Sequence, residues 1–213
     1  MAVTLLETLG TDLTVVNAAR VSFNKKKENF EEKDERLIAY LANHGHWTPF
    51  AHPQLQFRIV APIYVSRQLA KHQVGLVWNE VSRRYVSEKP QFYVPTAWRN
   101  KPENKKQGSG DSFITLNSEE WGVVDAAYSV SNEAYSMLIA KGVAPEQARM
   151  VLPLSMYTEW YWTGSLYAFA RICNLRIAPD AQEETRYIAQ EISKILRIKF
   201  PISWKYLSEM DKR

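Results

Sequence analysis

The spacing of apolar residues along the N-terminal half alternates between helical and extended periods. Residues 1–24 predict a short strand at Thr4–Leu6 and then a helix, which carries Val15, Val16, Ala19 and Arg20. A second helix follows Asn29, with Gly45 where a C-terminal cap belongs and with Leu37, Ile38 and Leu41 at helical spacing. Each segment therefore has one face suited to a core.

The period then changes to two. Leu55, Phe57 and Ile59 alternate with polar neighbours, which predicts a half-buried strand. Pro62 suits the first position of a helix that runs to about Lys71, and residues 74–86 predict a loop plus a strand. Residues 99–112 are rich in Lys, Asn, Gly and Ser, which indicates an exposed loop.

The C-terminal half predicts mostly helices. One begins after Asn117 as N-cap and stops at Gly142, and its spaced apolar positions are Trp121, Val124, Tyr128, Tyr135 and Leu138. Pro145 begins a short helix, and Ser155–Asn174 predicts a helix that is aromatic nearly all round and therefore buried. Pro179 starts a final helix that ends before Pro201, with Ile188, Ile192 and Ile195 on one face.

These elements predict an α+β fold, in which a mixed N-terminal sheet region packs with helices and precedes a helical C-terminal half. The length of 213 residues suits a single domain over 1–213. One cysteine, Cys173, excludes an intrachain disulfide and favours a reducing compartment. We find no secretory signal and no long apolar run, so we expect a cytoplasmic protein with no membrane partner.

The formal net charge is only +4, and acidic residues are interleaved with basic ones almost throughout. Nucleic-acid domains usually concentrate more positive charge on one face, so we expect no nucleic-acid partner. A single-stranded nucleic-acid binder that uses arginines and aromatic rings as a stacking groove stays open as an alternative.

Cationic side chains gather between Arg67 and Tyr85. The segment also holds a histidine, two amides, Glu80 and Ser82. Such runs usually form a solvated surface, but here the charges lie between apolar segments. An arginine fork donates two parallel hydrogen bonds to phosphate, and a serine in a turn adds another donor. The segment is therefore a candidate anion site.

Two further groups carry possible chemistry. Arg149 lies inside an apolar stretch, and burying it there is costly unless an anion meets it. Arg171 and Arg176 lie near the end of the predicted aromatic helix, where a side chain can point into a pocket. His44, His46 and His52 suggest a metal hydrolase, or histidines that cap a helix end and bond locally. We expect that the protein binds no metal. Cys173 is more readily interpreted as a buried side chain than as a nucleophile.

The sequence from Lys71 to Tyr85 resembles the flavin-dependent thymidylate synthases, also called the thymidylate synthase complementing family. Their signature is R-H-R followed by seven residues and a serine, and this serine is part of a second motif, N-E-x-S-x-R-Y. In this sequence the first motif reads Lys71-His72-Gln73, eight residues and Ser82. The second motif is intact as Asn79-Glu80-Val81-Ser82-Arg83-Arg84-Tyr85. Other blocks occur in family order, including 18–23, 44–50, Arg67-Gln68, 148–153 and 174–176.

The resemblance implies reductive methylation of dUMP to dTMP without a cysteine nucleophile. It implies FAD as cofactor, methylenetetrahydrofolate and NADPH as co-substrates, and a homotetramer with shared active sites. Arg176 would lie at the uracil ring as the catalytic group. The implied dUMP-binding residues are Gln68, Lys71, Glu80, Val81, Ser82, Arg83, Arg84, Arg149 and Arg176. The implied FAD-binding residues are His46, Thr48, Lys71, His72, Gln73, Glu80, Ser165 and Arg171.

The departures from the family pattern fall on the implied flavin side. Gln73 replaces an arginine, and Ser165, Tyr167, Arg171 and Asp180 stand where Asn, Arg, Asn and His are common. The residue added before Ser82 predicts a bulge within Gly75–Trp78. A homologue that binds dUMP and flavin with weak or no turnover is therefore a further alternative.

Overall fold

A four-stranded antiparallel sheet in the order β1-β2-β6-β3 organises the chain. The computed structural model describes residues 1–86, 88–103 and 108–208. The strands of this sheet are β1 (Ala2–Leu9), β2 (Gln54–Pro62), β3 (Leu76–Glu80) and β6 (Tyr157–Ser165). Mixed sheet and helix confirm the predicted α+β class, although the strand at Thr4–Leu6 is longer than expected.

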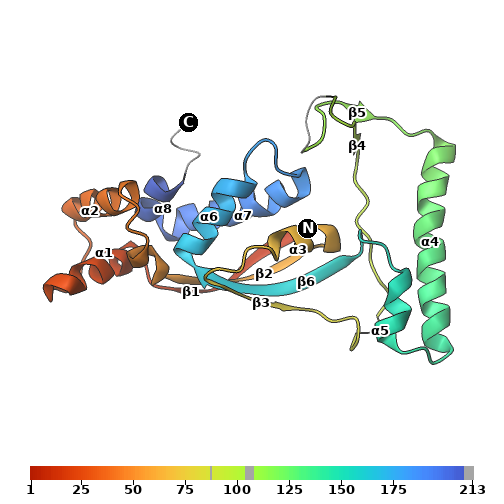
Figure 1. Cartoon of the computed structure of the whole chain (residues 1–213), viewed down its shortest axis with the longest axis horizontal. Coiled ribbons are helices and arrows are strands. Elements are labelled where there is room, and N and C mark those ends of the chain that lie inside the picture. The colour runs from red at the N-terminus through yellow and green to blue at the C-terminus, as the bar shows by residue number, and fades with distance from the viewer. Residues whose placement is uncertain (87, 104–107, 209–213) are drawn as a thin grey trace.

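Helices surround this sheet on one side and at both ends. In chain order they are α1 (Asp12–Arg20), η1 (Val21–Phe23), α2 (Glu32–Asn43), η2 (Thr48–Ala51), α3 (Ile63–Leu69), α4 (Ser118–Ala140), α5 (Pro145–Ala148), η3 (Arg149–Val151), α6 (Leu166–Arg176), α7 (Glu183–Lys199) and α8 (Pro201–Leu207). Figure 1 shows α3, α6 and α7 on one side of the sheet, and α4 standing apart at one end.

The predicted helix over Ser155–Asn174 is wrong in its first half. Residues 157–165 form β6, which pairs with β2 on one side and β3 on the other, and only α6 is helical. Trp160 and Trp162 are buried, whereas Tyr161 is 47 % exposed. The period is therefore two, and apolar residues between the buried positions hid it.

The core lies between the sheet and the helices above it. The Phe169 ring of α6 meets Phe57 of β2 edge-on, with centroids 4.9 Å apart, and meets Trp162 of β6 in the same way at 5.4 Å. Apolar side chains of α3 and α7 complete this layer, with Val65, Leu69, Ile188 and Ile192 fully buried. Large aromatic rings remove much apolar surface from water, so this layer anchors the fold.

The C-terminal helices also differ from expectation. The final helix predicted from Pro179 begins instead at Glu183, and α8 follows it after Phe200. Buried Asp12 at the start of α1 accepts hydrogen bonds from the backbone N–H groups of Ile202 (3.0 Å) and Ser203 (2.8 Å). Because a carboxylate stabilises the free N–H groups of a helix start, this contact ties α8 to α1.

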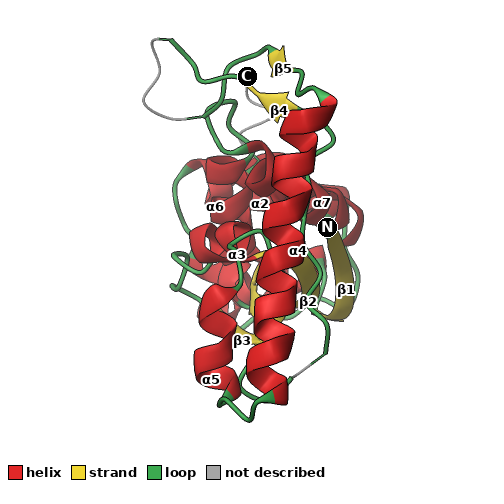
Figure 2. Ribbon diagram, turned by 90° about the vertical axis from the view of Figure 1, so that its right-hand side faces the viewer, coloured by secondary structure: helices red, strands yellow, loops and turns green. Residues whose placement is uncertain are grey.

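The segment 99–112 was expected to be an exposed loop, and residues 104–107 lie outside the described part. The rest is largely irregular, but its first residue belongs to β4 (Trp98–Arg99), which pairs with β5 (Phe113–Ile114) directly after the segment. This segment leads to α4, whose start and end agree with the predicted Asn117 cap and Gly142 stop. Figure 2 shows α4 along the outer side of the molecule, next to α5.

α4 packs within the chain through a few contacts, among them the Tyr128 ring stacked on Phe92 at 5.3 Å and the Trp121 ring 6.2 Å from the Trp98 ring, and most of its surface stays exposed. Tyr135 is its one buried residue, whereas Val123 and Val130 are 67 % and 63 % exposed. Most helices in proteins gain their stability from burying an apolar face. Within the described residues, no helix is long and apolar enough to cross a membrane.

Candidate active site

Two cavities lie on either side of α3. The first, which we call the α6 cavity, has a volume of about 990 Å³, and its lining includes Gln68, His72, Arg99, Arg171, Arg176 and Gln182. The second, the β3 cavity, has a volume of about 1080 Å³, and its lining includes Arg67, Glu80, Ser82, Arg83, Arg84 and Arg149. Consecutive residues of α3, Arg67 and Gln68, thus serve different cavities.

In the α6 cavity, the proposed catalytic arginine is held by a histidine. Arg176 lies in the last turn of α6, and its Nε donates to Nε2 of His72 at 3.1 Å. Burial lowers the pKa of His72, and the charges of Arg176 and Arg171 lower it further. The imidazole is therefore neutral at physiological pH, and it accepts at Nε2 and carries its proton on Nδ1.

Gln68 of α3 is held at both ends of its amide. Its Oε1 accepts from the Thr185 hydroxyl at 3.1 Å, and its Nε2 donates to Oε1 of Gln182. Gln182 in turn donates to the buried carboxylate of Glu184 at 3.1 Å. Arg99 Nη2 lies 2.7 and 2.9 Å from the two Glu184 oxygens, which completes a chain of contacts from β4 to α3.

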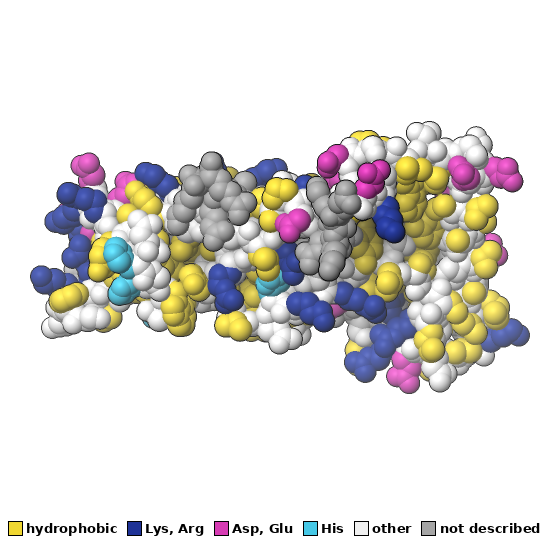
Figure 3. Space-filling view, turned by 45° about the horizontal axis from the view of Figure 1, so that its top comes forward, with side chains coloured by type: hydrophobic (Ala, Val, Ile, Leu, Met, Phe, Trp, Pro, Cys, Tyr) yellow, Lys and Arg dark blue, Asp and Glu magenta, His cyan; other side chains and the backbone are white. Residues whose placement is uncertain are grey.

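In the β3 cavity, the end of β3 turns sharply. The hydroxyl oxygen of Ser82 accepts from the backbone N–H of Arg84 at 3.3 Å and from its Nε at 3.4 Å. Arg149 is exposed at the start of η3 and donates through Nε to the Glu146 carbonyl at 3.2 Å. Figure 3 shows Lys and Arg side chains gathered on the visible face toward the α4–α5 end.

Four glutamates line the β3 cavity, and the side chains of two of them, Glu80 and Glu159, are bonded to neighbours. Glu80 Oε1 accepts from the Thr158 hydroxyl at 2.6 Å, and Glu80 Oε2 accepts from Trp78 Nε1 at 3.3 Å. Glu159 forms a two-bond ion pair with Arg58, with both distances 2.6 Å. In contrast, Arg84 and Arg149 form no ion pair within the described residues, so their charges are available to an anion.

The resemblance implied that Arg84, Arg149 and Arg176 converge on one dUMP molecule. The structure brings Arg84 and Arg149 together with Ser82, Arg83, Val81 and Glu80 in the β3 cavity. It places Arg176 with Gln68, His72 and Arg171 in the α6 cavity instead. Within a single chain, therefore, the predicted dUMP residues form two separate groups.

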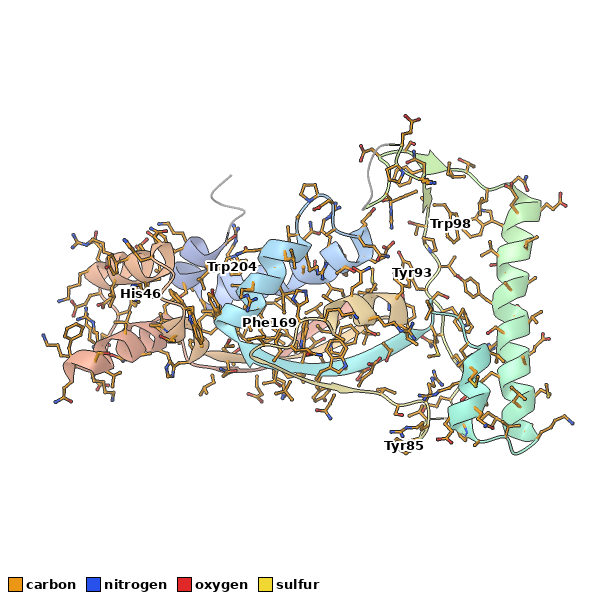
Figure 4. All side chains as sticks on the ribbon, viewed as in Figure 1. His46, Tyr85, Tyr93, Trp98, Phe169 and Trp204 are labelled. Carbon is orange, nitrogen blue, oxygen red and sulfur yellow. The ribbon has the colours of Figure 1, made fainter. Side chains whose placement is uncertain are left out.

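The other predicted cofactor residues lie on exposed turns or are internally bonded. Lys71 and Gln73 are exposed after α3, and Thr48 is exposed at the start of η2. Ser165 is buried, and its hydroxyl oxygen caps α6 by accepting from Ala168 N–H at 3.2 Å. Figure 4 shows His46 and Tyr85 at opposite ends of the sheet. One chain does not bring this set together with the β3 cavity.

One histidine of the cluster, His44, has a local role. His44 Nδ1 lies 2.9 Å from the Tyr40 carbonyl at the end of α2, as the capping alternative predicts. Among the described residues, no group of three or more His, Cys, Asp or Glu side chains could hold a metal ion.

Cys173 is fully buried in α6, and burial raises the pKa of its thiol. A thiol must ionise to act as a nucleophile, so a buried, protonated Cys173 is structural.

The extra residue before Ser82 does not form a strand bulge. β3 pairs with β6 in unbroken register from Leu76 to Glu80, which contradicts the expected bulge for Leu76–Trp78. The turn before it closes with Leu76 N–H on the Gln73 carbonyl at 3.2 Å, and Gly75 has φ +77°. Gly75 thus lies in the left-handed region, which favours glycine, and the chain turns there just before the strand begins.

Sequence reasoning missed Arg99, Gln182 and Glu184. Arg99 was assigned to the start of an exposed loop, and the two acids of 183–184 look like ordinary first-turn residues of a helix. Arg99 and Glu184 are 85 positions apart, so no local spacing reveals the pair.

Comparison with known proteins assigns the chain to a family. The family model of the thymidylate synthase complementing protein matches residues 4–202. The chain is 39 % identical over 207 residues to a flavin-dependent thymidylate synthase of Thermus thermophilus, covering 97 % of this chain and 75 % of that protein. It is 39 % identical to the enzyme of the same name from Kosmotoga olearia, covering 94 % and 87 %.

A solved structure also resembles the chain closely. The UMP/dUMP methylase PolB of Streptomyces cacaoi, bound with 5-Br dUMP, superposes with a TM-score of 0.82 at 30 % identity, covering 96 % of this chain and 93 % of that one. The chain therefore belongs to the thymidylate synthase complementing family, the flavin-dependent thymidylate synthases.

Proposed function

We propose that this chain methylates dUMP to dTMP by the flavin-dependent route, with methylenetetrahydrofolate as carbon donor and NADPH as reductant. The observation that carries the proposal is the pair of cationic cavities, one with Arg84 and Arg149 and the other with Arg176 held by His72. The relatives' names support the activity and the flavin.

The β3 cavity is suited to the phosphate of dUMP. Within the described residues, the guanidinium groups of Arg84 and Arg149 form no ion pair, and Ser82 adds a hydroxyl next to a turn. Charge-assisted hydrogen bonds from such groups to phosphate are short and strong. We assign Arg83 and Val81 to the walls of this site and Glu80, held by Thr158 and Trp78, to its edge.

The α6 cavity is suited to the pyrimidine. Methylation needs electron density at C5, which rises when charge on the ring's N3 and O2 is stabilised. Arg176 lines this cavity and supplies a positive charge for this purpose, and His72 holds its Nε in place. Preorganised charge of this kind often lowers the reaction barrier more than any other single effect.

The chain's donor set fits a flavin cofactor. Arg171 lines the α6 cavity and forms no ion pair within the described residues, so a cation is available to the FAD diphosphate. His46, Thr48, Lys71, His72, Gln73, Glu80 and Arg171 would hold the cofactor, whereas the hydroxyl of Ser165, the other expected residue, is buried and caps α6. When bound and reduced, FAD supplies the hydride that converts the transferred methylene carbon to a methyl group, as C5 loses its proton.

Because the two groups of arginines lie in different cavities of one chain, we propose that the active site is assembled between chains of a homotetramer. The β3 cavity of one chain would then face the α6 cavity of another. The exposed apolar residues of α4 support such an assembly, because Val123, Val130 and Met137 stay exposed in the single chain.

Subunit complementation tests this arrangement directly. We expect Arg84→Ala and Arg176→Ala proteins to be nearly inactive alone in dTMP formation from dUMP, methylenetetrahydrofolate and NADPH. Unfolding and refolding them together should restore part of the activity, because some mixed sites contain both intact cavities. A mixture of Arg84→Ala with Arg149→Ala serves as the control, because both changes affect the same cavity.

Each outcome has a distinct meaning. No recovery in the first mixture, with mixed tetramers present, would contradict the shared site. A purified wild-type protein that carries flavin and binds dUMP but forms no dTMP would favour the alternative of a homologue without turnover.

A further inference from the structure

A glutamate in the β3 cavity is bonded to neutral donors and not to an arginine. Glu80 lines this cavity together with Arg84 and Arg149. Within the described residues it forms no ion pair. Its carboxylate oxygens accept instead from the Thr158 hydroxyl at 2.6 Å and from Trp78 Nε1 at 3.3 Å. Neutral groups of the sheet therefore hold this carboxylate next to exposed cations.

The strand register explains how Thr158 reaches the carboxylate. Glu80 is the last residue of β3 and lies opposite Trp160 of β6, and β6 continues past the end of β3 to Tyr157. Side chains two residues apart share one face of a strand, so Thr158 lies on the same face as Trp160 and is a diagonal neighbour of Glu80. Thr158 is only 8 % exposed. Its hydroxyl is therefore a donor fixed by the sheet.

The held carboxylate keeps acceptor capacity for a ligand. A carboxylate has about four lone-pair sites, and the bonds from Thr158 and Trp78 use one on each oxygen of Glu80. A phosphate is itself an anionic acceptor, so it cannot use the remaining sites. The donors of dUMP are N3–H and the 3′-hydroxyl of its deoxyribose. Because the base is assigned to the α6 cavity, the 3′-hydroxyl, on the sugar that carries the phosphate, is the donor left for Glu80.

We propose that Thr158 is a positioning residue, which fixes Glu80 to accept a hydrogen bond from the sugar hydroxyl of the nucleotide. This inference rests on the proposed function. Without the Thr158 bond, an acid at an exposed strand end is free to turn toward Arg84 or Arg149, because opposite charges attract. Such a pair would neutralise a cation that the phosphate needs. The bond keeps the acid and the cations apart, so the hydroxyl and the phosphate each meet a separate partner.

The affinities for dUMP and for 2′,3′-dideoxyuridine 5′-monophosphate, which lacks the 3′-hydroxyl, test the proposal by calorimetry on the FAD-loaded enzyme. The wild type should prefer dUMP about tenfold or more, the effect of one hydrogen bond to a charged acceptor. Thr158→Val keeps the shape of the side chain but removes the donor, so this preference should largely disappear. Thr158→Ser keeps the hydroxyl and should retain most of it. The ratio reports the sugar contact, which a general loss of stability does not change.

Two further variants isolate the effect. Thr163→Val removes a hydroxyl of the same strand that accepts from Gln56 at 3.0 Å and does not line the cavity, so it should leave both affinities unchanged. Glu80→Ala should lose the preference, and adding Thr158→Val to it should change nothing further, because Thr158 acts through that carboxylate.

The outcomes separate this inference from the proposed function. If Thr158→Val or Glu80→Ala keeps the wild-type preference for dUMP, the positioning role is wrong and the proposed function stands. The same conclusion follows if the wild type binds the two nucleotides equally well. If the wild type binds neither nucleotide, both fall.

Discussion

The two cavities on either side of α3 differ in how firmly their cations are held. In the α6 cavity, Arg176 is half-buried and bonded to His72, and the Gln68 amide is fixed through a chain of side chains. In the β3 cavity, Arg84 and Arg149 are exposed. Arg84 bonds to Ser82 and lies over the Tyr85 ring, and Arg149 bonds to a carbonyl of its own turn.

This difference matches the chemistry assigned to each cavity. A phosphate is a strong anion that mobile cations can follow, so binding tolerates flexible side chains. Polarising a pyrimidine requires charge at a fixed place, because a group that must reorganise during the reaction loses much of its effect. A firmly held cavity for the base and a looser one for the phosphate therefore divide the work of one active site.

The largest effect is expected from Arg176→Ala. It removes the fixed charge at the base, and turnover should fall about 10²–10³-fold, the cost of one preorganised group. Arg176→Lys keeps the charge but loses the Nε bond to His72, so its rate should lie between wild type and alanine. Single-turnover measurements at saturating dUMP, with the flavin spectrum unchanged, check this. A normal rate in Arg176→Ala would contradict the assignment of the α6 cavity.

A smaller effect, on binding, is expected from Arg84→Ala. Losing one charge-assisted contact to phosphate should raise the KM for dUMP about tenfold at low salt, since such a bond contributes about 1.5–3 kcal/mol. The difference from wild type should shrink as salt rises, because the site is exposed. Arg36→Ala, an exposed cation on α2, is the control for net charge and should leave KM unchanged.

A pH-dependent effect is expected at His72. Its pKa is lowered from 6.5 in the folded chain, so the unfolded chain binds the proton more readily. Stability is therefore unaffected above pH 6.5 and falls as the pH drops below it, and protonation also removes the acceptor for Arg176. We therefore expect kcat of the wild type to fall at acid pH. In His72→Gln the amide oxygen still accepts from Arg176 and does not titrate, so kcat should fall less at acid pH than in the wild type. An unchanged acid limb in His72→Gln would contradict this role.

The smallest effect is expected from Cys173→Ala. The thiol is buried outside both cavities, so turnover should equal that of the wild type, while the free energy of unfolding falls by about 1 kcal/mol from the lost packing. Chemical denaturation and dTMP formation measured on the same preparation check both parts. An inactive but folded variant would overturn the cysteine-independent scheme.

Local patterns in the sequence predicted those elements whose period or caps are clear. The start of α4 follows from Asn117, which accepts from two backbone N–H groups, and its end follows from Gly142. β6 was mistaken for a helix because Tyr161, on the exposed face, is as aromatic as its buried neighbours Trp160 and Trp162. A central strand between two partners is disguised when apolar residues occupy both faces.

The sequence predicted the residue types of the candidate site but not their distribution between two cavities. Ser82 and Arg84 are close in sequence, so their shared turn could be anticipated, whereas Arg149 joins them only through the placement of η3. The hydrogen bonds from Arg99 through Glu184 and Gln182 to Gln68 join three distant parts of the chain. Such contacts arise from tertiary packing, which residue spacing does not encode.

The single thiol of the chain allows the opening of its core to be measured by chemical labelling. Because Cys173 is sealed in the core with no other cysteine in the sequence, an alkylating reagent labels a molecule only after α6 has opened. The labelling rate at high reagent concentration therefore measures the opening rate of the helix that carries Arg176. Ligands that close the active site should slow this labelling, which gives a binding assay that needs neither turnover nor flavin colour.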